Sequence, residues 1–371
     1  MLAKAGLLLL SDRLGSRSIE IDTHSKRWSR SSLDLHAVFM ASIIVDRLSK
    51  VYPVAIKEPG FAGTLKHFFQ RTYKEINAVR DVSFEIQSGE IVGFLGANGA
   101  GKTTTLKMLS GLIHPSTGTV RVAGYIPFKR ETAFLKQITL VMGQKQQLIW
   151  DLPALDSLKI NAAVYGLSDR TAELRIQELA AMLSIQDKLT QPIRKLSLGE
   201  RMKAELLAAL IHEPKVLFLD EPTLGLDVNA QVAVRQFLRE YNQRFNATIL
   251  LTSHYMADIT ALCDRVLVIH QGLLIYDGSL AGLVDRFSPC REVNVEFKHI
   301  YPRHKLETYA EVREVEGASA RFLVTQELLT KTVSQILGEL EVVDLSITDP
   351  PIDDIIGQVF QSGNAETVVA K

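Results

Sequence analysis

The sequence predicts an α/β fold around a mostly parallel sheet, and three features predict it. Apolar stretches of strand length alternate with helical stretches over residues 42–285, as in chains of strand–helix–strand units. The run "KVLFLDEP" at 215–222 is short, apolar and bounded by turn formers, which is typical of a parallel strand buried on both faces. A glycine-rich loop at 96–101 separates a predicted strand from a predicted helix, which is the setting of a phosphate-binding loop.

The composition is that of a globular protein. The 371 residues are 46% hydrophobic and 23% charged, and the length indicates two or three domains. Lys+Arg and Asp+Glu both number 42, so the net charge is zero and no nucleic-acid partner is expected. Cys263 and Cys290 show neither a disulfide framework nor metal-ligand spacing, which fits a reducing cytosol. Cys263 stands in an apolar helical run and is predicted to be a buried, inert thiol.

Residues 1–39 differ in texture from the rest. The apolar run in "MLAKAGLLLL" is shorter than the core of most signal peptides, and no small-residue cleavage site follows it. The stretch after it is polar and aperiodic. We therefore expect a disordered N-terminal extension, or an upstream artefact with Met40 as the working start. No window of the chain reaches the roughly 18–20 apolar residues that a membrane-spanning helix needs.

The elements of the main domain follow one another from Ser42. Residues 53–75 are predicted to be an insertion with a basic, aromatic helical piece, because Pro and Gly interrupt the strand pattern there. A helix-rich part is expected over about 145–215, where apolar residues recur at threes and fours. Strands are expected at 42–52, 77–87, 90–95, 116–125, 216–220, 247–254 and 265–278, and helices at 101–113, 154–167, 170–185, 199–213 and 229–245.

The pattern changes again near residue 286. Strands are expected at 291–298, 319–325 and 342–348, with a helix at 327–340 before the last one. The expected organisation is therefore an N-terminal extension (1–39), a main domain (40–285) and a small α+β accessory domain (286–371).

The loop that begins at Gly96 carries the clearest chemistry. It fits the pattern G-x-x-x-x-G-K-[ST] and has the required strand before it and helix after it. Glycines let successive backbone N–H groups wrap an anion, while Lys102 and a Mg²⁺ ion held by Thr103 would supply the remaining positive charge. The predicted phosphate-binding residues are Gly96, Ala97, Asn98, Gly99, Ala100, Gly101, Lys102, Thr103 and Thr104.

Five polar residues stand where predicted strands and loops end. Asp220 and Glu221 close a buried strand; Asp220 would hold Mg²⁺, and Glu221 would act on the water that attacks the γ-phosphate. Gln144 follows another strand and could touch both metal and water, which predicts a metal site of Thr103, Gln144 and Asp220. His254 could reach the γ-phosphate, so the predicted catalytic residues are Glu221, His254 and Gln144. Asp227 follows the acid pair in "TLGLD".

Together these motifs resemble the ATP-binding subunit of ABC transporters. They stand in the order Tyr52, "GANGAGKTT", Gln144, "LSLGE" (196–200), "VLFLDE", "GLD" and His254. The resemblance covers about residues 42–285 and implies a P-loop NTPase fold of ABC type, with an N-terminal antiparallel β subdomain and a helical subdomain. It also implies that Tyr52 stacks on adenine, with Tyr73 as the alternative, and that Asp227 belongs to the D-loop.

The resemblance gives "LSLGE" a role in a second subunit's site. In that family this signature loop completes the ATP site of an antiparallel partner, so Ser197, Leu198, Gly199 and Glu200 would act in trans and two ATPs would lie between two subunits. Leu198 and Glu200 depart from the family's "LSGGQ". Glu200 would bring a negative charge towards the phosphate, from which we expect weaker or slower closure of the dimer.

The resemblance also implies which partners the protein has and where in the cell it acts. The stretches 56–69, 141–158 and 251–266 resemble ATP-binding subunits of drug and polysaccharide exporters, including viologen-exporter-like systems, paired with separate transmembrane permeases. The expected protein is then a homodimer or paired ATPase subunit at the cytoplasmic face of the inner membrane, with Gln144 coupling to the permease. Trp150 and Leu152 are the candidates for contacting it, and packing in the core is the alternative role for Trp150.

Soluble ABC ATPases of translation or of DNA repair are the alternative. Translation factors of this type carry two cassettes, whereas this chain has one. The chromosome and repair ATPases place long coiled coils between the two phosphate motifs, and no sustained heptads separate Lys102 from Asp220. The sequence therefore favours transport.

Overall fold

The computed structural model describes residues 41–56, 72–143, 147–287 and 290–350. The expectations for residues 1–39, for the helical piece within 57–71 and for Gln144 lie outside these ranges. In the part of the chain that is described, no helix is both long enough and apolar enough to cross a bilayer.

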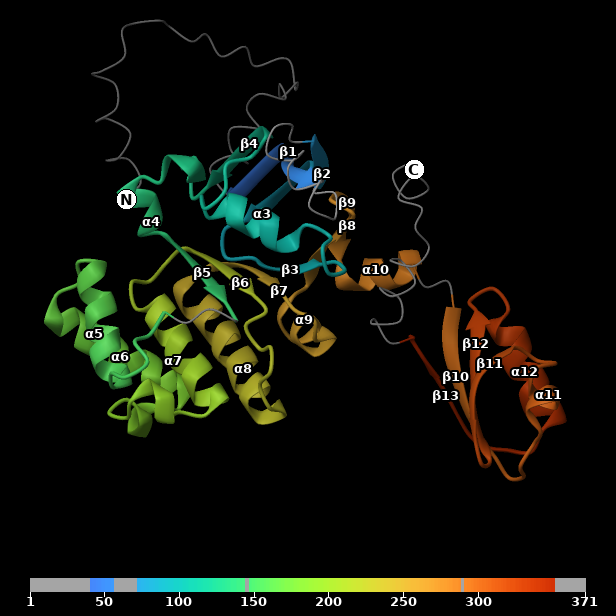
Figure 1. The fold of residues 1–371 in the computed structure, drawn as a ribbon. Helices are drawn as coiled ribbons and strands as arrows, with labels where there is room; N and C mark the ends of the chain where they lie inside the picture. The colour runs from blue at the N-terminus through green and yellow to red at the C-terminus, as the bar shows by residue number, and fades with distance from the viewer. Residues whose placement is uncertain (1–40, 57–71, 144–146, 288–289, 351–371) are drawn as a thin grey trace, which may run out of the picture. The chain divides into compact units, whose positions relative to one another are not determined.

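A six-stranded sheet forms the centre of the main domain, with the strand order β5-β6-β7-β3-β8-β9 (Figure 1). The first five strands in this order run parallel, and β9 pairs antiparallel with β8. This confirms the predicted mostly parallel sheet. The strands are β3 (Ile91–Leu95), β5 (Ile138–Met142), β6 (Val216–Asp220), β7 (Thr248–Thr252), β8 (Arg265–His270) and β9 (Leu273–Ser279).

A three-stranded antiparallel sheet precedes it, made of β1 (Ala41–Ile56), β2 (Thr72–Gln87) and β4 (Thr117–Val122) in the order β2-β1-β4. The prediction that the strand pattern stops at residue 53 was wrong. Pro53 pairs with Glu75, and the hairpin of β1 and β2 continues to its described ends. Pairing of β1 with β4 stops at Ser49, so Pro53 lies where β1 has a single neighbour, and a proline is tolerated there.

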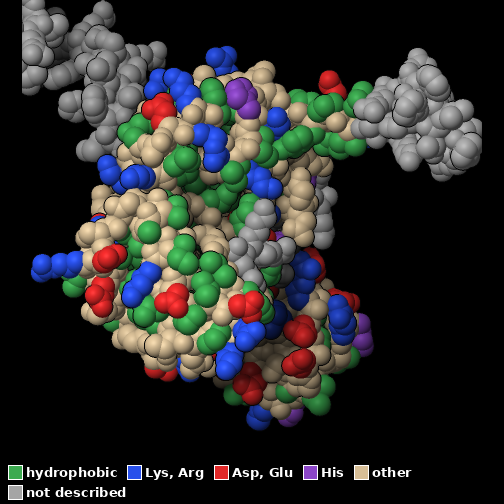
Figure 2. All heavy atoms as spheres, turned by 60° about the vertical axis from the view of Figure 1, so that its left-hand side comes forward, with side chains coloured by type: hydrophobic (Ala, Val, Ile, Leu, Met, Phe, Trp, Pro, Cys, Tyr) green, Lys and Arg blue, Asp and Glu red, His purple; other side chains and the backbone are tan. Residues whose placement is uncertain are grey.

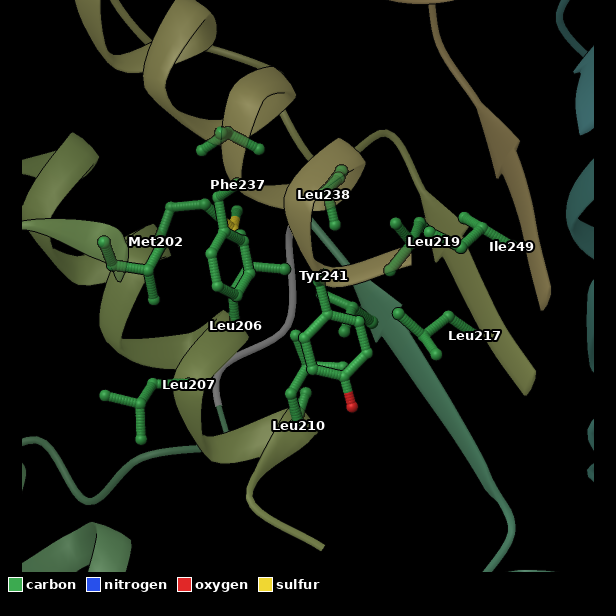
Figure 3. Close-up of a cluster of buried hydrophobic side chains, with 14 of the residues drawn as sticks. Met202, Leu206, Leu207, Leu210, Leu217, Leu219, Phe237, Leu238, Tyr241 and Ile249 are labelled. Carbon is green, nitrogen blue, oxygen red and sulfur yellow. The ribbon is translucent and has the colours of Figure 1, made fainter. Parts of the chain in front are cut away.

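Helices cover the central sheet, and each carries an apolar stripe that explains its position. Met202, Leu206 and Leu210 of α7 meet Phe237 and Tyr241 of α8 in one buried cluster above the strands (Figure 3). The predicted helices are confirmed. They are α3 (Lys102–Leu109), α5 (Ala154–Val164), α6 (Asp169–Leu183), α7 (Leu198–Leu210) and α8 (Val228–Phe245).

Shorter helices join these elements, and of these the sequence pattern indicated only the apolar helical run that contains Cys263. Two of them flank the sites described below: α4 (Thr132–Leu135) precedes β5, and α9 (Met256–Leu262) precedes β8. The others are η1 (Pro127–Lys129), η2 (Gln186–Lys188), η3 (Ile193–Lys195) and α10 (Leu280–Phe287). Cys263 caps α9 and is buried; burial raises its pKa, which agrees with an inert thiol.

The C-terminal residues fold around a core of their own. Four antiparallel strands in the order β11-β12-β10-β13 pack against α11 and α12, as predicted for an α+β unit. The sequence pattern missed β11, because "EVREVE" is dominated by charge. The elements are β10 (Cys290–Phe297), α11 (Arg303–Leu306), β11 (Glu311–Glu316), β12 (Ser319–Thr325), α12 (Leu329–Glu339) and β13 (Val342–Thr348).

Candidate ATP site

The loop between β3 and α3 is shaped by glycines that no other residue could replace without strain. Gly101 has φ 113° and precedes the first residue of α3, in a region that L side chains avoid. A Cβ on Gly96 would lie 2.4 Å from the carbonyl oxygen of Ile269. The backbone of β8 and this loop therefore approach each other closely, and any side chain larger than that of glycine at position 96 would meet the Ile269 carbonyl.

Lys102 folds back into the same loop. Its ammonium donates hydrogen bonds to the carbonyl oxygens of Gly96 and Ala97, the latter at 3.2 Å. The residue is 7% exposed. Burial lowers the pKa of Lys102, and the charges of Glu221 and Asp220 oppose that shift. A positive charge is thus held at the loop by two carbonyls and two nearby carboxylates.

Asp220 connects the start of α3, which follows the phosphate-binding loop, to the end of β7. Its Oδ2 accepts a hydrogen bond of 2.9 Å from the Thr103 hydroxyl, and its Oδ1 accepts one of 2.7 Å from Thr252 at the end of β7. The structure thus brings together Thr103 and Asp220, two of the three residues predicted for the metal. Two oxygen ligands converging on one point suit Mg²⁺, which usually takes few protein ligands and keeps several waters.

Glu221 and His254 contact each other directly, which the sequence did not predict. His254 Nε2 lies 2.7 Å from Glu221 Oε1. Glu221 has φ 57°, an unusual conformation for a non-glycine residue that is frequent at active sites. The backbone N–H of Glu221 is held at 3.1 Å by the carbonyl of Thr252, so neighbouring strands fix this strained residue.

A cavity of about 440 Å³ unites these groups. Its lining mixes the phosphate loop, the acid pair and the histidine. The residues that line it are Asn98, Thr103, Met142, Gly143, Asp220, Glu221, Leu224 and His254. Gln144 directly follows Gly143 but lies outside the described residues. Three predicted site residues that the structure describes, Tyr52, Ser197 and Asp227, do not line this cavity.

The two tyrosines weighed for adenine differ in their surroundings. Tyr52 lies on β1, half-buried, with the ammonium of Lys50 at 5.2 Å from its ring centroid. Tyr73 lies on β2 and is 53% exposed. The ring of Tyr52 is therefore already held by a cation–π contact, whereas Tyr73 lies largely in solvent.

The loop "LSLGE" begins α7 with a capping box. Ser197 Oγ accepts from the backbone N–H of Glu200 at 3.2 Å, and Glu200 Oε2 accepts from the N–H of Ser197 at 2.9 Å. Lys188 lies 3.3 Å from the Glu200 carboxylate. The hydrogen bond from Ser197 lowers the pKa of Glu200, with Lys188 acting in the same direction. The carboxylate expected to project towards a phosphate is thus turned to its own helix. The S-x-x-E spacing could have revealed this.

Asp227 caps the neighbouring helix. Its Oδ1 accepts a hydrogen bond of 2.9 Å from the N–H of Ala230 at the start of α8. A Cβ on Gly199 would lie 2.9 Å from the Cβ of Ala230. The starts of α7 and α8 therefore touch, and Gly199 permits this contact.

Comparison with known proteins identifies the family of this chain. The family described as "ABC transporter" matches residues 79–224, and "EvrA-like ABC transporter, C-terminal domain" matches residues 289–348. The ABC transporter ATP-binding protein NatA of Bacillus subtilis is 38% identical over 217 residues, which are 58% of this chain and 88% of that protein. A Nod factor export ATP-binding protein I of Burkholderia lata is 35% identical over 245 residues, 64% of this chain and 78% of that protein.

Solved structures agree as well. A structure titled as the ATP-binding subunit of an ABC transporter superposes with a TM-score of 0.54 and 28% identity, covering 66% of this chain and 92% of that one. The chain belongs to the ABC transporter family of ATP-binding proteins and is thereby an ATPase of the ABC class.

Proposed function

We propose that the protein hydrolyses ATP to power a membrane exporter, as one ATPase of a closing dimer. The observation that carries this proposal is the 2.7 Å contact between Glu221 and His254 beside the phosphate loop. A carboxylate beside an imidazole at the rim of a phosphate cavity is suited to orient and deprotonate an attacking water.

Several polar residues in and beside the cavity have a proposed task in this reaction. Glu221 accepts the proton of the water, and His254 orients Glu221 and contacts the γ-phosphate. When ATP binds, the Lys102 ammonium exchanges its two carbonyl acceptors for phosphate oxygens. Charged acceptors thereby replace neutral ones, and the hydrogen bonds become stronger. Thr103 and Asp220, with Gln144, would hold a Mg²⁺ ion whose charge neutralises the phosphates.

The second part of the site comes from a partner subunit in this proposal. Ser197 and Gly199 begin α7, whose N-terminus carries a partial positive charge and free N–H groups suited to a phosphate. In this subunit, Ser197 and Gly199 do not line the described cavity. A second copy, or a paired ATPase, would therefore bring its own loop "LSLGE" to this ATP, and adenine would stack on Tyr52.

A groove that shares Met142 with the ATP cavity is suited to the permease. It has a volume of about 600 Å³ and runs between β5 and the ends of α3, α4 and α5. Figure 2, which brings the α4 and α5 side of Figure 1 forward, shows hydrophobic side chains exposed there between charged ones. Apolar residues that line the groove are Leu112, Leu135, Leu140, Met142, Val164 and Tyr165.

The segment beside that groove carries the predicted permease contacts. Trp150 is 43% exposed and Val164 is 75% exposed, and exposed apolar side chains of this size mark protein interfaces. We propose that a cytoplasmic segment of separate permease subunits binds here, next to Gln144 and near Leu152. The protein would then act at the cytoplasmic face of the inner membrane, without a nucleic-acid partner.

The proposal also covers the direction of transport and the domain boundaries. NatA apart, relatives include proteins named for Nod factor export and for linearmycin resistance, which supports an exporter. We propose that residues 40–285 form the ATP-binding domain, with the helical subdomain at about 145–215, and that 286–371 form an accessory domain.

The test is a Glu221→Gln variant of the full-length protein. It should bind ATP, lose hydrolysis and accumulate as a closed dimer on size-exclusion chromatography with MgATP. A variant that stays monomeric at saturating MgATP would contradict the dimer mechanism. Affinity purification from detergent-solubilised native membranes should recover polytopic membrane proteins. Recovery of ribosomal proteins or DNA instead would favour the soluble ABC ATPases.

A further inference from the structure

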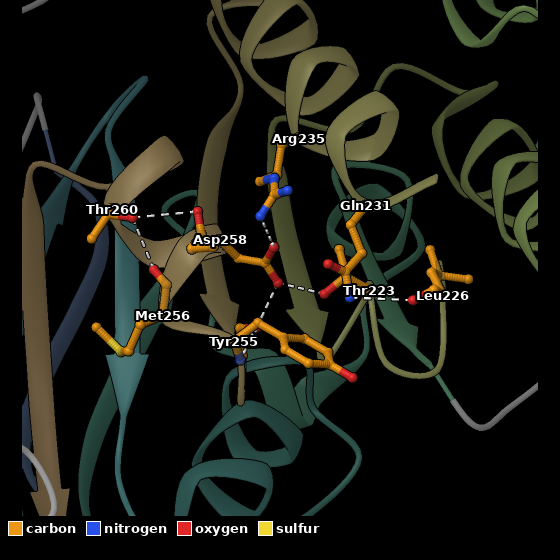
Figure 4. A network of polar contacts seen from close by, with 10 residues as sticks. Thr223, Leu226, Gln231, Arg235, Tyr255, Met256, Asp258 and Thr260 are labelled. Atoms are coloured by element: carbon orange, nitrogen blue, oxygen red, sulfur yellow. Dashed lines mark hydrogen bonds and ion pairs between the residues drawn. The ribbon is translucent and has the colours of Figure 1, made fainter. Parts of the chain in front are cut away.

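Asp258 lies at the centre of a buried polar network beside the ATP site (Figure 4). Its side chain is 1% exposed. Oδ2 accepts hydrogen bonds from the hydroxyls of Thr223 and Ser253, the latter at 2.6 Å, and Oδ1 lies 3.1 Å from a guanidinium nitrogen of Arg235. A buried carboxylate is tolerated when its charge and its lone pairs are satisfied in this way.

The partners of Asp258 come from the segments that carry the proposed catalytic pair. Thr223 stands two residues after Glu221, and Ser253 directly precedes His254. Arg235 lies on α8, the helix that Asp227 caps. One carboxylate therefore ties the segment that follows β6 to the segment that follows β7.

The backbone around His254 depends on this network. The Ser253 hydroxyl donates to Asp258 and also accepts a hydrogen bond of 3.0 Å from the N–H of Tyr255. The His254 side chain itself is 42% exposed, so packing holds it only in part. Its distance from Glu221 is set largely by where its own backbone lies.

Stabilisation of α9 alone does not explain the arrangement. A carboxylate in the first turn of a helix favours that helix through its charge, and Asp258 occupies the first turn of α9. Such a role needs no hydroxyl from outside the helix, yet Thr223 comes from a segment 35 residues away.

We infer that Asp258 is a positioning residue: by holding Thr223 and Ser253 together, it fixes the spacing between Glu221 and His254. The inference rests on the proposed function of that pair. Loss of the network should displace the pair relative to the bound phosphate, and misplacement of a catalytic group slows the chemical step more than it weakens binding.

The experiment compares Thr223→Val with Thr223→Ser in the full-length protein. Valine has the shape of threonine but cannot donate to Asp258, whereas serine keeps the hydroxyl. Thr223→Val should lower kcat for ATP roughly tenfold with KM changed less than twofold, and Thr223→Ser should restore most of kcat. Ser253→Ala should reproduce the effect of valine. Thr332→Val, at a buried threonine of the C-terminal core, is the matched control and should leave kcat unchanged.

A double-mutant cycle tests whether Thr223→Val lowers kcat by displacing His254 relative to Glu221. In a His254→Ala background, Thr223→Val should lower kcat little further, because the pair it positions is already broken. The inference is overturned if valine and serine at 223 act alike, if valine lowers the melting temperature but not kcat, or if the two losses simply add. Failure of the proposed function is seen separately, as full ATPase activity in Glu221→Gln.

Discussion

Glu205 Oε2 accepts a hydrogen bond of 2.9 Å from the backbone N–H of Gln147. Its other oxygen accepts from the N–H of Leu148 at 3.3 Å, and one turn earlier on α7 the guanidinium of Arg201 lies 5.1 Å from the centroid of the Trp150 ring. The helix that begins with the loop "LSLGE" thus holds the segment beside the apolar groove. Movement of α7 by ATP would move that segment too.

Replacement of Glu205 by alanine should loosen this segment. Glu205 is 4% exposed, and loss of a buried acceptor for two backbone N–H groups should destabilise the protein by about 2 kcal/mol. Hydrogen exchange followed by mass spectrometry should show faster exchange at residues 147–150, while peptides of α12 remain as protected as before. Glu205→Gln keeps one acceptor oxygen, so its exchange rate at residues 147–150 should lie between those of the unchanged protein and Glu205→Ala. Unchanged exchange at 147–150 in Glu205→Ala would show that α7 does not hold the segment.

Replacement of Glu200 by glutamine should raise the ATPase rate at a fixed, subsaturating ATP concentration. The change removes a negative charge from the loop proposed to meet a partner's phosphate. The melting temperature should hardly change, because glutamine makes the same capping box. Glu200→Ala is the control for the cap and should lose about 1 kcal/mol of stability. An ATPase rate that stays the same in Glu200→Gln would sink the idea that this charge slows closure.

Tyr52 and Tyr73 can be separated by their effects on KM. Loss of the ring in Tyr52→Ala should raise KM for ATP roughly tenfold, since base–aromatic stacking contributes about 1–3 kcal/mol. The effect on kcat at saturation should be small. Tyr73→Ala is the matched comparison on the neighbouring strand and should leave KM unchanged. The reverse result would assign the adenine contact to Tyr73.

His212 should make the folded state sensitive to acid. It is stacked on Tyr165 with 3.7 Å between the ring centroids, and burial lowers its pKa from 6.5 to about 4. The unfolded chain takes up this proton near pH 6.5 and the folded chain only near pH 4, so stability falls as pH drops through that interval. The loss is at most about 3 kcal/mol. Denaturant unfolding at pH 7 and pH 4.5 should show a smaller difference in His212→Gln than in the unchanged protein.

Sequence patterns were sufficient where a local rule decides the structure. The glycines and Lys102 of the phosphate loop, the buried strand before Asp220 and the apolar stripes of α7 and α8 all follow from spacing and residue type. These features depend on neighbours within a few positions of the chain, so reading along the sequence recovers them.

Contacts between distant segments could not be read in that way. Glu221 and His254 meet because β6 and β7 are adjacent in the sheet, and nothing in either segment alone specifies a 2.7 Å approach. Nothing in the sequence around Asp258 indicates that its carboxylate accepts hydrogen bonds from Thr223 and Ser253. The strand β11 was missed because its two apolar residues, Val312 and Val315, stand three positions apart among charged residues and do not alternate. A register shift between Val312 and Glu314 interrupts its pairing with β12.

Among the residues that the structure describes, the ten buried apolar side chains of the C-terminal core lie between Val293 and Leu340. A unit that completes its own interior can be acquired, lost or exchanged as one piece without repacking the ATPase. The match to NatA spans 88% of that protein but 58% of this chain, so a large part of this chain lies outside the region shared with that relative. An interior of its own would let the sequence of this unit change without disturbing the side chains that pack on the central sheet.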